Sequence, residues 1–235
     1  GEILTIVGES GSGKTTVIRA ILGSLPNSGK ITNGKIFFEN HNLLKYSVRD
    51  WLAIRGKNIS MIFQDSGSAL DPIVRIGKQF RELFTSHIEI TNDECDRRAI
   101  ELLESVSLPN GADILRRYPH ELSGGQRQRV GIAMALALDP ALLIGDEPTS
   151  ALDVTTQSQV VMQMLELAKE HNSAIVMVTH NLGVAAYMSD YIIVMKKGCV
   201  VDAGTPQDIL ENPSNEYTKQ LKDAVPTLGG GRYID

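Results

Sequence analysis

The sequence predicts an α/β fold built on a mostly parallel β-sheet with helices on both of its faces. Short apolar runs typical of buried strands occur at Ile3–Val7, Ala141–Ile144 and Ala174–Thr179, and strands buried on both faces read in this way. Segments with helical spacing follow these runs, and helical connections of this kind join parallel strands. A glycine-rich loop comes directly after the first run. We therefore expect a doubly covered sheet with a loop site at one edge.

The elements expected in the first half of the chain begin with that strand and a helix that Pro26 and Gly29 terminate. An Asn-Gly turn is expected at 33–34 between short strands. Thr91 and Glu94 have the spacing of a capping box. The expected elements are a strand at Ile3–Val7, a helix at Lys14–Leu25, strands within Lys30–Leu44, a short helix at Tyr46–Ile54, a strand at Ile59–Phe63, and mostly helix from 65 to 138, including Val130–Leu138.

The second half returns to alternating strands and helices. Lys196-Lys197-Gly198 is expected to be a hairpin turn, and Thr205-Pro206 has the pattern of an N-cap followed by proline at the first helical position. The triple glycine at 229–231 is expected to be frayed. The expected elements are strands at Ala141–Ile144, Ala174–Thr179, Tyr191–Met195 and Cys199–Asp202, and helices at Thr155–Glu170 and Leu182–Met188.

Composition limits the functions that the chain can have. The 235 residues carry a net charge of −5 without a long basic block, which disfavours nucleic-acid binding. The cysteines, Cys95 and Cys199, lie far apart and form neither a disulfide framework nor a zinc motif. No apolar run approaches the roughly 18 residues of a membrane span. The chain opens on a buried strand without Met, so we expect it to begin inside a larger domain.

The first chemical motif is Gly8-Glu9-Ser10-Gly11-Ser12-Gly13-Lys14-Thr15, between a strand and a helix. This is the pattern and context of a phosphate loop. Its glycines let backbone N–H groups wrap phosphates, Lys14 can neutralise the β- and γ-phosphates, and Thr15 can ligate Mg²⁺. The alternative, a chance glycine-rich turn, is disfavoured by the strand–loop–helix context.

Polar side chains end the buried strands further along the chain. Asp146 can hold Mg²⁺, and Glu147 is placed to activate a water as general base. Gln64 could reach the metal or the water, and His180 could bond the γ-phosphate or orient the water. On isolated evidence each also fits a plain structural role: carboxylates ending a strand, an exposed loop glutamine, and a strand-end histidine.

A second glycine-rich stretch, Leu122-Ser123-Gly124-Gly125-Gln126, precedes an apolar helical run. Ser123 is expected to cap that helix, and a capped helix N-terminus is an anion site. The chain thus has two phosphate-seeking segments more than a hundred residues apart, and the second has no ligand of its own.

Together these motifs resemble the ATP-binding-cassette (ABC) ATPases in order and spacing, over essentially the whole chain. The resemblance implies a P-loop NTPase (RecA-like) core at 1–64 and 139–211, a small antiparallel β portion, an inserted helical subdomain at 65–138 and a tail at 212–235. It identifies Gln64 with the Q-loop and His180 with the switch histidine. The implied nucleotide-binding residues are Gly8, Glu9, Ser10, Gly11, Ser12, Gly13, Lys14, Thr15 and Thr16.

The resemblance also implies a ligand for the second stretch. Domains of this family pair head to tail, so that Ser123, Gly124, Gly125 and Gln126 would contact the ATP of a partner ATPase, either a second copy or a paralogous chain. Asp153, in the D-loop segment, would align the two sites. Thr15, Gln64 and Asp146 would be the Mg²⁺ ligands, and Lys14, Gln64, Glu147 and His180 would act in catalysis.

Finer resemblance points to the oligopeptide and dipeptide importers, a branch that includes nickel and metallophore importers. It rests on Ala69-Leu70-Asp71-Pro72, Tyr118-Pro119-His120-Glu121 and Thr179-His180-Asn181-Leu182-Gly183. Two membrane permease subunits, an extracytoplasmic solute-binding protein and a peripheral position on the cytoplasmic face of the plasma (inner) membrane are then implied. A soluble cassette of DNA repair or translation is less favoured, because no coiled-coil insertion is present. A regulator without catalysis is disfavoured because Glu147 and His180 are present.

Three features depart from the family pattern. The adenine-stacking aromatic residue of the family lies upstream of the phosphate loop, before this chain begins. Asn215-Glu216 replaces a usual His-Pro pair, and Asn181 stands where aspartate is usual. No C-terminal cysteine cluster follows, so no iron–sulfur centre is expected.

Overall fold

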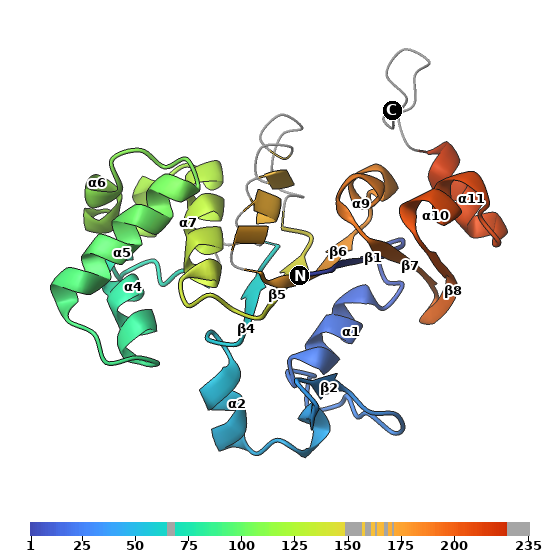
Figure 1. Ribbon diagram of the computed structural model, residues 1–235, viewed down its shortest axis with the longest axis horizontal. Helices are drawn as coiled ribbons and strands as arrows, with labels where there is room; N and C mark the ends of the chain where they lie inside the picture. The colour runs from blue at the N-terminus through green and yellow to red at the C-terminus, as the bar shows by residue number, and fades with distance from the viewer. Residues whose placement is uncertain are drawn as a thin grey trace, which may run out of the picture. The chain divides into compact units, whose positions relative to one another are not determined.

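The computed structural model describes residues 1–64, 69–148, 157, 161–162, 164–166, 169–170 and 172–224 (Figure 1). The chain forms two compact units. We call Glu2–Lys45 with Ile175–Asp235 the phosphate-loop unit, and Gly1 with Tyr46–Ala174 the signature unit. The predicted helix at Thr155–Glu170 lies largely outside the described residues, and Asp153 and the glycines at 229–231 lie wholly outside them.

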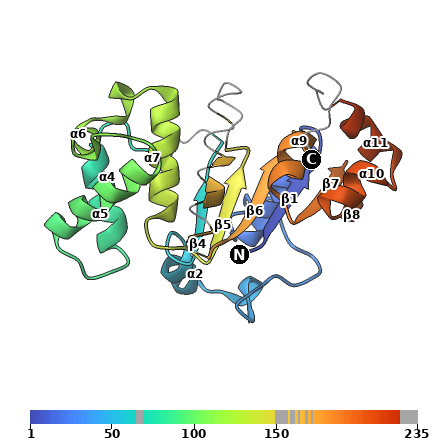
Figure 2. The same ribbon diagram turned by 45° about the horizontal axis from the view of Figure 1, so that its top comes forward.

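The phosphate-loop unit is built on strands in the order β6-β1-β7-β8, which run side by side (Figure 2). β1 pairs in parallel with both β6 and β7, whereas β7 and β8 are antiparallel. Lys197 and Gly198 make the reversal with φ of 49° and 82°, the positive values that a tight hairpin needs. The strands are β6 (Ala174–Thr179), β1 (Ile3–Val7), β7 (Tyr191–Lys196) and β8 (Cys199–Gly204).

Apolar faces of short helices bury one side of this sheet. Val7, Val194 and Ile192 are fully buried in a cluster that also takes in Leu182 and Tyr217. Each such side chain contributes roughly 1.5–3 kcal/mol relative to exposure. The helices of the unit are α1 (Lys14–Ile21), α9 (Leu182–Met188), α10 (Pro206–Glu211) and α11 (Glu216–Asp223).

Helix α1 ends four residues earlier than the predicted Leu25. Gly23 has a φ of 60°, and the N–H groups of Gly23 and Ser24 donate to the carbonyls of Ala20 and Arg19 at 3.2 and 2.8 Å. This is a Schellman motif, which satisfies the last carbonyls of a helix. The prediction was wrong because it took Pro26 as the terminator when glycine had already ended the helix.

The small antiparallel pair lies within the predicted segment Lys30–Leu44, but its turn differs from the predicted one. β2 (Phe37–Phe38) and β3 (His41–Asn42) are joined at Glu39 and Asn40, whose φ values are 46° and 64°. The predicted turn at 33–34 is therefore not the hairpin turn, although Gly34 does have a positive φ of 97°. A 3₁₀ turn at Leu43–Lys45 follows the pair.

The signature unit combines a parallel strand pair with a group of helices. β4 (Ile59–Ile62) pairs with β5 (Leu142–Asp146), so both expected strands are confirmed with small shifts at their ends. The helices of this unit whose bounds are described are α2 (Val48–Ile54), α4 (Ile76–Thr85), α5 (Asn92–Ser105), α6 (Gly111–Arg116) and α7 (Gly124–Leu136), with a 3₁₀ turn at Pro119–Glu121. α5 packs against α4, α6 and α7, and α7 packs on β4. The mixed α/β class with a mainly parallel sheet is thus confirmed.

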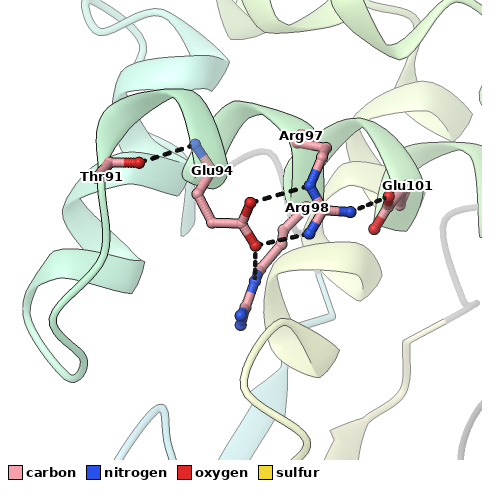
Figure 3. A network of polar contacts seen from close by, with 5 residues as sticks. All are labelled: Thr91, Glu94, Arg97, Arg98 and Glu101. Atoms are coloured by element: carbon pink, nitrogen blue, oxygen red, sulfur yellow. Dashed lines mark hydrogen bonds and ion pairs between the residues drawn. The ribbon is translucent and has the colours of Figure 1, made fainter.

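The N-terminus of α5 shows only half of the predicted capping box (Figure 3). The Thr91 hydroxyl accepts the Glu94 N–H at 3.3 Å. The Glu94 carboxylate does not return to the cap; it accepts two bonds from Arg97, at 2.6 and 2.9 Å, and one from Arg98 at 3.0 Å. The arginine fork offers charge-assisted bonds, which are stronger than a bond to a neutral N–H. Bonds from Arg97 and then Arg98 lower the Glu94 pKa to about 2.

Glu94→Gln should lower the free energy of unfolding near pH 7 and have less effect near pH 3. The ionised carboxylate contributes stability that is fully present above its ordinary pKa of 4.5 and is lost as the pH falls through the folded pKa of about 2. Urea unfolding at both pH values measures the difference. Glu104→Gln, on an exposed part of the same helix, is the control; an equal loss from Glu94→Gln at both pH values would contradict the assignment.

Candidate functional site: a phosphate loop and a capped signature helix

The phosphate loop is shaped by glycines that other residues could not replace. A Cβ on Gly8 would lie 2.2 Å from the Met195 carbonyl oxygen, so the loop approaches β7 more closely than a side chain allows. Gly11 and Gly13 have φ of 79° and 100°, which favour glycine. Gly13 is the N-cap of α1, and its carbonyl accepts the Val17 N–H at 3.1 Å. The loop therefore turns directly into a helix N-terminus.

Two polar side chains inside this loop are buried. Lys14 is 5% exposed, and its ammonium donates to the carbonyls of Gly8 at 2.7 Å and Glu9 at 2.9 Å. These bonds offset part of the cost of burying the charge. Ser12 is 4% exposed, and its hydroxyl has no hydrogen-bond partner among the described residues. A buried cation, an unsatisfied hydroxyl and a glycine-rich loop with its backbone N–H groups form a donor set that fits a nucleotide's phosphates.

The C-terminal helix α11 supports the loop through Tyr217. Its hydroxyl accepts the Glu9 N–H at 2.9 Å, and its ring lies under the Lys196 ammonium, 4.2 Å from the ring centroid. Tyr217 is 3% exposed, and burial raises the pKa of its hydroxyl. On sequence alone, the adjoining Asn215-Glu216 pair was noted only as a departure from the family pattern, and Tyr217 was given no role. A buried aromatic with a polar tip was the available signal for a role, because such tips need a partner.

His180 lies at the same edge as the phosphate loop. β1 and β6 are parallel and in register from Ile3–Ile175 to Val7–Thr179, so Gly8 and His180 are the next residues on neighbouring strands. Asn181 is the N-cap of α9, where its side chain accepts the Val184 N–H at 3.1 Å. This explains an asparagine in place of the usual aspartate, since both residues cap helices equally well. An asparagine before an apolar helical run was the signal for this cap.

In the signature unit, Gln64 and the two carboxylates also meet at one edge. Ile62 is in register with Gly145 in the parallel β4–β5 pair, so Gln64, just beyond β4, follows the same sheet edge as Asp146, the last residue of β5, and Glu147 after it. Asp146 and Glu147 are half-buried, and Gln64 is exposed. Glu147 has a φ of 46°, a conformation that costs a non-glycine residue about 1–3 kcal/mol and that is concentrated at functional sites.

The signature stretch caps α7 as expected. The Ser123 hydroxyl accepts the Gln126 N–H at 3.2 Å, and the Gln126 side chain accepts the Ser123 N–H at 2.9 Å, so the capping box is complete. Arg127 donates to the Leu122 carbonyl at 2.6 Å. Ser123 and Gly124 are exposed. α7 begins at Gly124, six residues before the predicted Val130, and ends at Leu136.

The predicted residues thus fall into two groups. The phosphate-loop unit brings together Gly8–Thr15 and His180, and the signature unit brings together Gln64 and Asp146-Glu147 and presents Ser123–Gln126. Their roles, and a shared nucleotide, remain predictions. Within the described part of the chain, no group of three His, Cys, Asp or Glu side chains could hold a metal, and no helix is long and apolar enough to cross a membrane.

Comparison with known proteins gives the class to which the fold and these motifs belong. Residues 1–150 match the ABC transporter family. That span is more than half of the chain, and the chain belongs to this family.

Relatives within the family include dipeptide and oligopeptide transport ATP-binding proteins. The chain is 44% identical over 229 residues to the dipeptide transport ATP-binding protein DppD of Lactococcus lactis subsp. cremoris, covering 97% of this chain and 66% of that protein. It is 45% identical over 229 residues to the oligopeptide transport ATP-binding protein OppD of Bacillus subtilis, covering 97% of this chain and 64% of that protein. The chain therefore spans about two thirds of the length of these curated relatives.

Solved structures support the same class. The ATP-binding cassette MJ0796, in a dimeric post-hydrolysis state bound to ADP and Pi, superposes with a TM-score of 0.76 at 30% identity, covering 87% of this chain and 85% of that one. CbiO1 of Clostridium perfringens, part of an ABC transporter complex, has a TM-score of 0.74 at 28% identity, covering 90% and 80% of the two chains.

Tyr217→Phe should weaken nucleotide binding by about two- to tenfold, because a typical hydrogen bond contributes about 0.5–1.5 kcal/mol net. The reason is that the Glu9 N–H would lose the acceptor that fixes the first turn of the loop. Titration with a fluorescent ATP analogue measures the affinity. Tyr191→Phe, at a tyrosine that is 45% exposed in the same unit, is the control, and equal affinities for both variants would contradict the role given to the hydroxyl.

Proposed function

We propose that this chain is the Mg-ATP-hydrolysing subunit of an importer of oligopeptides or dipeptides. The observation that carries the proposal is the phosphate loop, whose glycines, buried Lys14 and unsatisfied Ser12 hydroxyl suit a nucleotide. In this proposal, the chain consists of a RecA-like core at 1–64 and 139–211, a helical subdomain at 65–138 and a tail at 212–235.

Each residue then has a defined part in hydrolysis. The loop N–H groups and the Lys14 ammonium bind the β- and γ-phosphates. Glu147 accepts a proton from water, whose oxygen bonds to the γ-phosphorus while the bond to the bridging oxygen breaks and ADP leaves. His180 orients the γ-phosphate. Bound Mg²⁺ supplies neutralisation of phosphate charge, and Thr15, Asp146 and Gln64 are the residues that would hold it.

The signature belongs, in this proposal, to the site of a partner ATPase. Its capped helix N-terminus exposes Ser123 and Gly124, and such an end favours an anion. Ser123 and Gly125 would bond to the γ-phosphate held by the partner, and Asp153 would help to align the two sites. The related cassette MJ0796 is described as dimeric with ADP and Pi, which supports this arrangement. The partner is a second copy or a paralogous chain.

The names of the relatives support a peptide cargo, and the remaining partners are part of the same proposal. These names specify dipeptide and oligopeptide transport, which favours peptides over nickel or a metallophore. Two membrane permease subunits would form the path, an extracytoplasmic solute-binding protein would deliver the peptide, and this chain would lie peripherally on the cytoplasmic face. Peptide-stimulated ATPase activity of the reconstituted full-length complex tests this proposal, and stimulation by nickel alone would overturn the peptide assignment.

Glu147→Gln should reduce turnover by about 100-fold or more, the usual contribution of a general base, and leave ATP affinity unchanged. An amide cannot take the proton of the attacking water, so ATP should stay bound and hold the paired ATPases together. Phosphate release and size-exclusion chromatography with ATP measure the two effects. Glu89→Gln, at an exposed position of the same unit, is the control, and unchanged turnover in Glu147→Gln would refute the assignment.

Ser123→Arg should leave ATP binding by the isolated subunit intact and abolish ATP-dependent pairing. The bulky cation would occupy the helix N-terminus where the partner's phosphate is expected. Ser86→Arg places the same side chain at the exposed C-terminal cap of α4 and should pair normally. Pairing that survives Ser123→Arg would rule out the proposed contact with the partner.

A further inference from the structure

One buried side chain joins the signature helix to the residue that follows Glu147. Gln128 lies in α7, five residues after Ser123, and is 5% exposed. Its side-chain amide donates a hydrogen bond to the Pro148 carbonyl, 20 residues further along the chain. Gln128 lies just beyond the signature stretch Leu122–Gln126 and was not among the predicted site residues.

The backbone that this bond holds is unusual. Glu147 has a φ of 46° although it is not glycine, and a residue before proline ordinarily adopts an extended conformation instead. Such a conformation persists only when its surroundings impose it. Pro148 is buried and has no N–H to donate, so its carbonyl is the one backbone group of this residue to which a neighbour can hydrogen-bond.

Gln128 lies on a closely packed helix, so it can hold the Glu147–Pro148 backbone in place. Val130, Ile132 and Ala133, the next buried apolar residues of α7, are each at most 1% exposed, and α7 packs against β4. A side chain anchored on a packed helix keeps its rotamer and therefore fixes the atom to which it bonds. The direction of the Glu147 carboxylate depends on this turn.

We propose that Gln128 is a positioning residue for Glu147, holding the Glu147–Pro148 backbone in the conformation needed to activate water. The inference rests on the proposed function. Because α7 begins at the signature, the same bond links the surface proposed to meet the partner's nucleotide with the general base for this chain's own nucleotide.

The unit contains a matched control for this residue. Gln79, in α4, is 8% exposed and also donates to backbone carbonyls, those of Asp71 at 3.0 Å and Val74 at 2.8 Å. Gln79→Met and Gln128→Met each replace a buried amide by an apolar side chain of similar length. Both should lose stability, because both leave carbonyls unsatisfied. Only the second variant touches the turn at Glu147.

The test compares both variants in the full-length subunit within its complex, normalised to the fraction that binds nucleotide. Gln128→Met should lower kcat by about tenfold or more, since a small displacement of a reacting group costs up to about 100-fold, with KM for ATP changed less than twofold. Gln79→Met should keep the kcat of the wild type. Gln128→Asn, which keeps the amide but shortens its reach, should show the same loss of kcat if Gln128→Met fails to fold.

A double-mutant cycle separates positioning from general structural damage. In a Glu147→Gln background, Gln128→Met should cause no further loss of the residual turnover, because groups that act as one unit are not additive. Additive losses, or a wild-type kcat in both Gln128 variants, would overturn the inference. If Glu147→Gln itself turns over normally, the proposed function fails instead, so the two failures are distinguishable.

Discussion

Parallel strand pairing brings the candidate residues together within each unit. In a parallel pair the carboxyl ends of both strands reach the same edge, so the residues that follow them become neighbours however far apart they are in sequence. Val7 opposite Thr179 places the phosphate loop beside His180. Ile62 opposite Gly145 places Gln64 beside Asp146 and Glu147. A one-residue shift in either register would separate these groups and turn buried side chains outward.

Helix α7 combines an exposed, capped N-terminus with a buried face that carries a polar side chain. Its first turn is capped and leaves Ser123 and Gly124 exposed, as an anion-binding end requires. Its buried side carries apolar residues and Gln128, whose amide bonds to the Pro148 carbonyl. A buried amide costs free energy unless it is bonded. Its place on this helix is therefore best explained by the turn that it holds.

Much of the fold followed from local sequence signals. Three features could be predicted because each depends on neighbouring residues alone. They are the strand–loop–helix at Ile3–Ile21, the α7 cap and the reversal at Lys197-Gly198. The errors occurred where two local signals competed. Helix α1 ends at the Gly23 turn, upstream of Pro26. The hairpin turn forms at Glu39-Asn40 and not at Asn33-Gly34. The Glu94 carboxylate accepts hydrogen bonds from Arg97 and not from the N-cap backbone.

The sequence by itself determined the family, the phosphate loop and the chemical identity of each candidate group, because those motifs are contiguous and have fixed spacing. The tertiary structure decided which distant groups support them. The Tyr217 hydroxyl accepts the Glu9 N–H across more than 200 residues, and Gln128 reaches the peptide after Glu147. Such contacts depend on how strands and helices pack, and a hydrogen bond between distant residues leaves no periodic signal in the sequence.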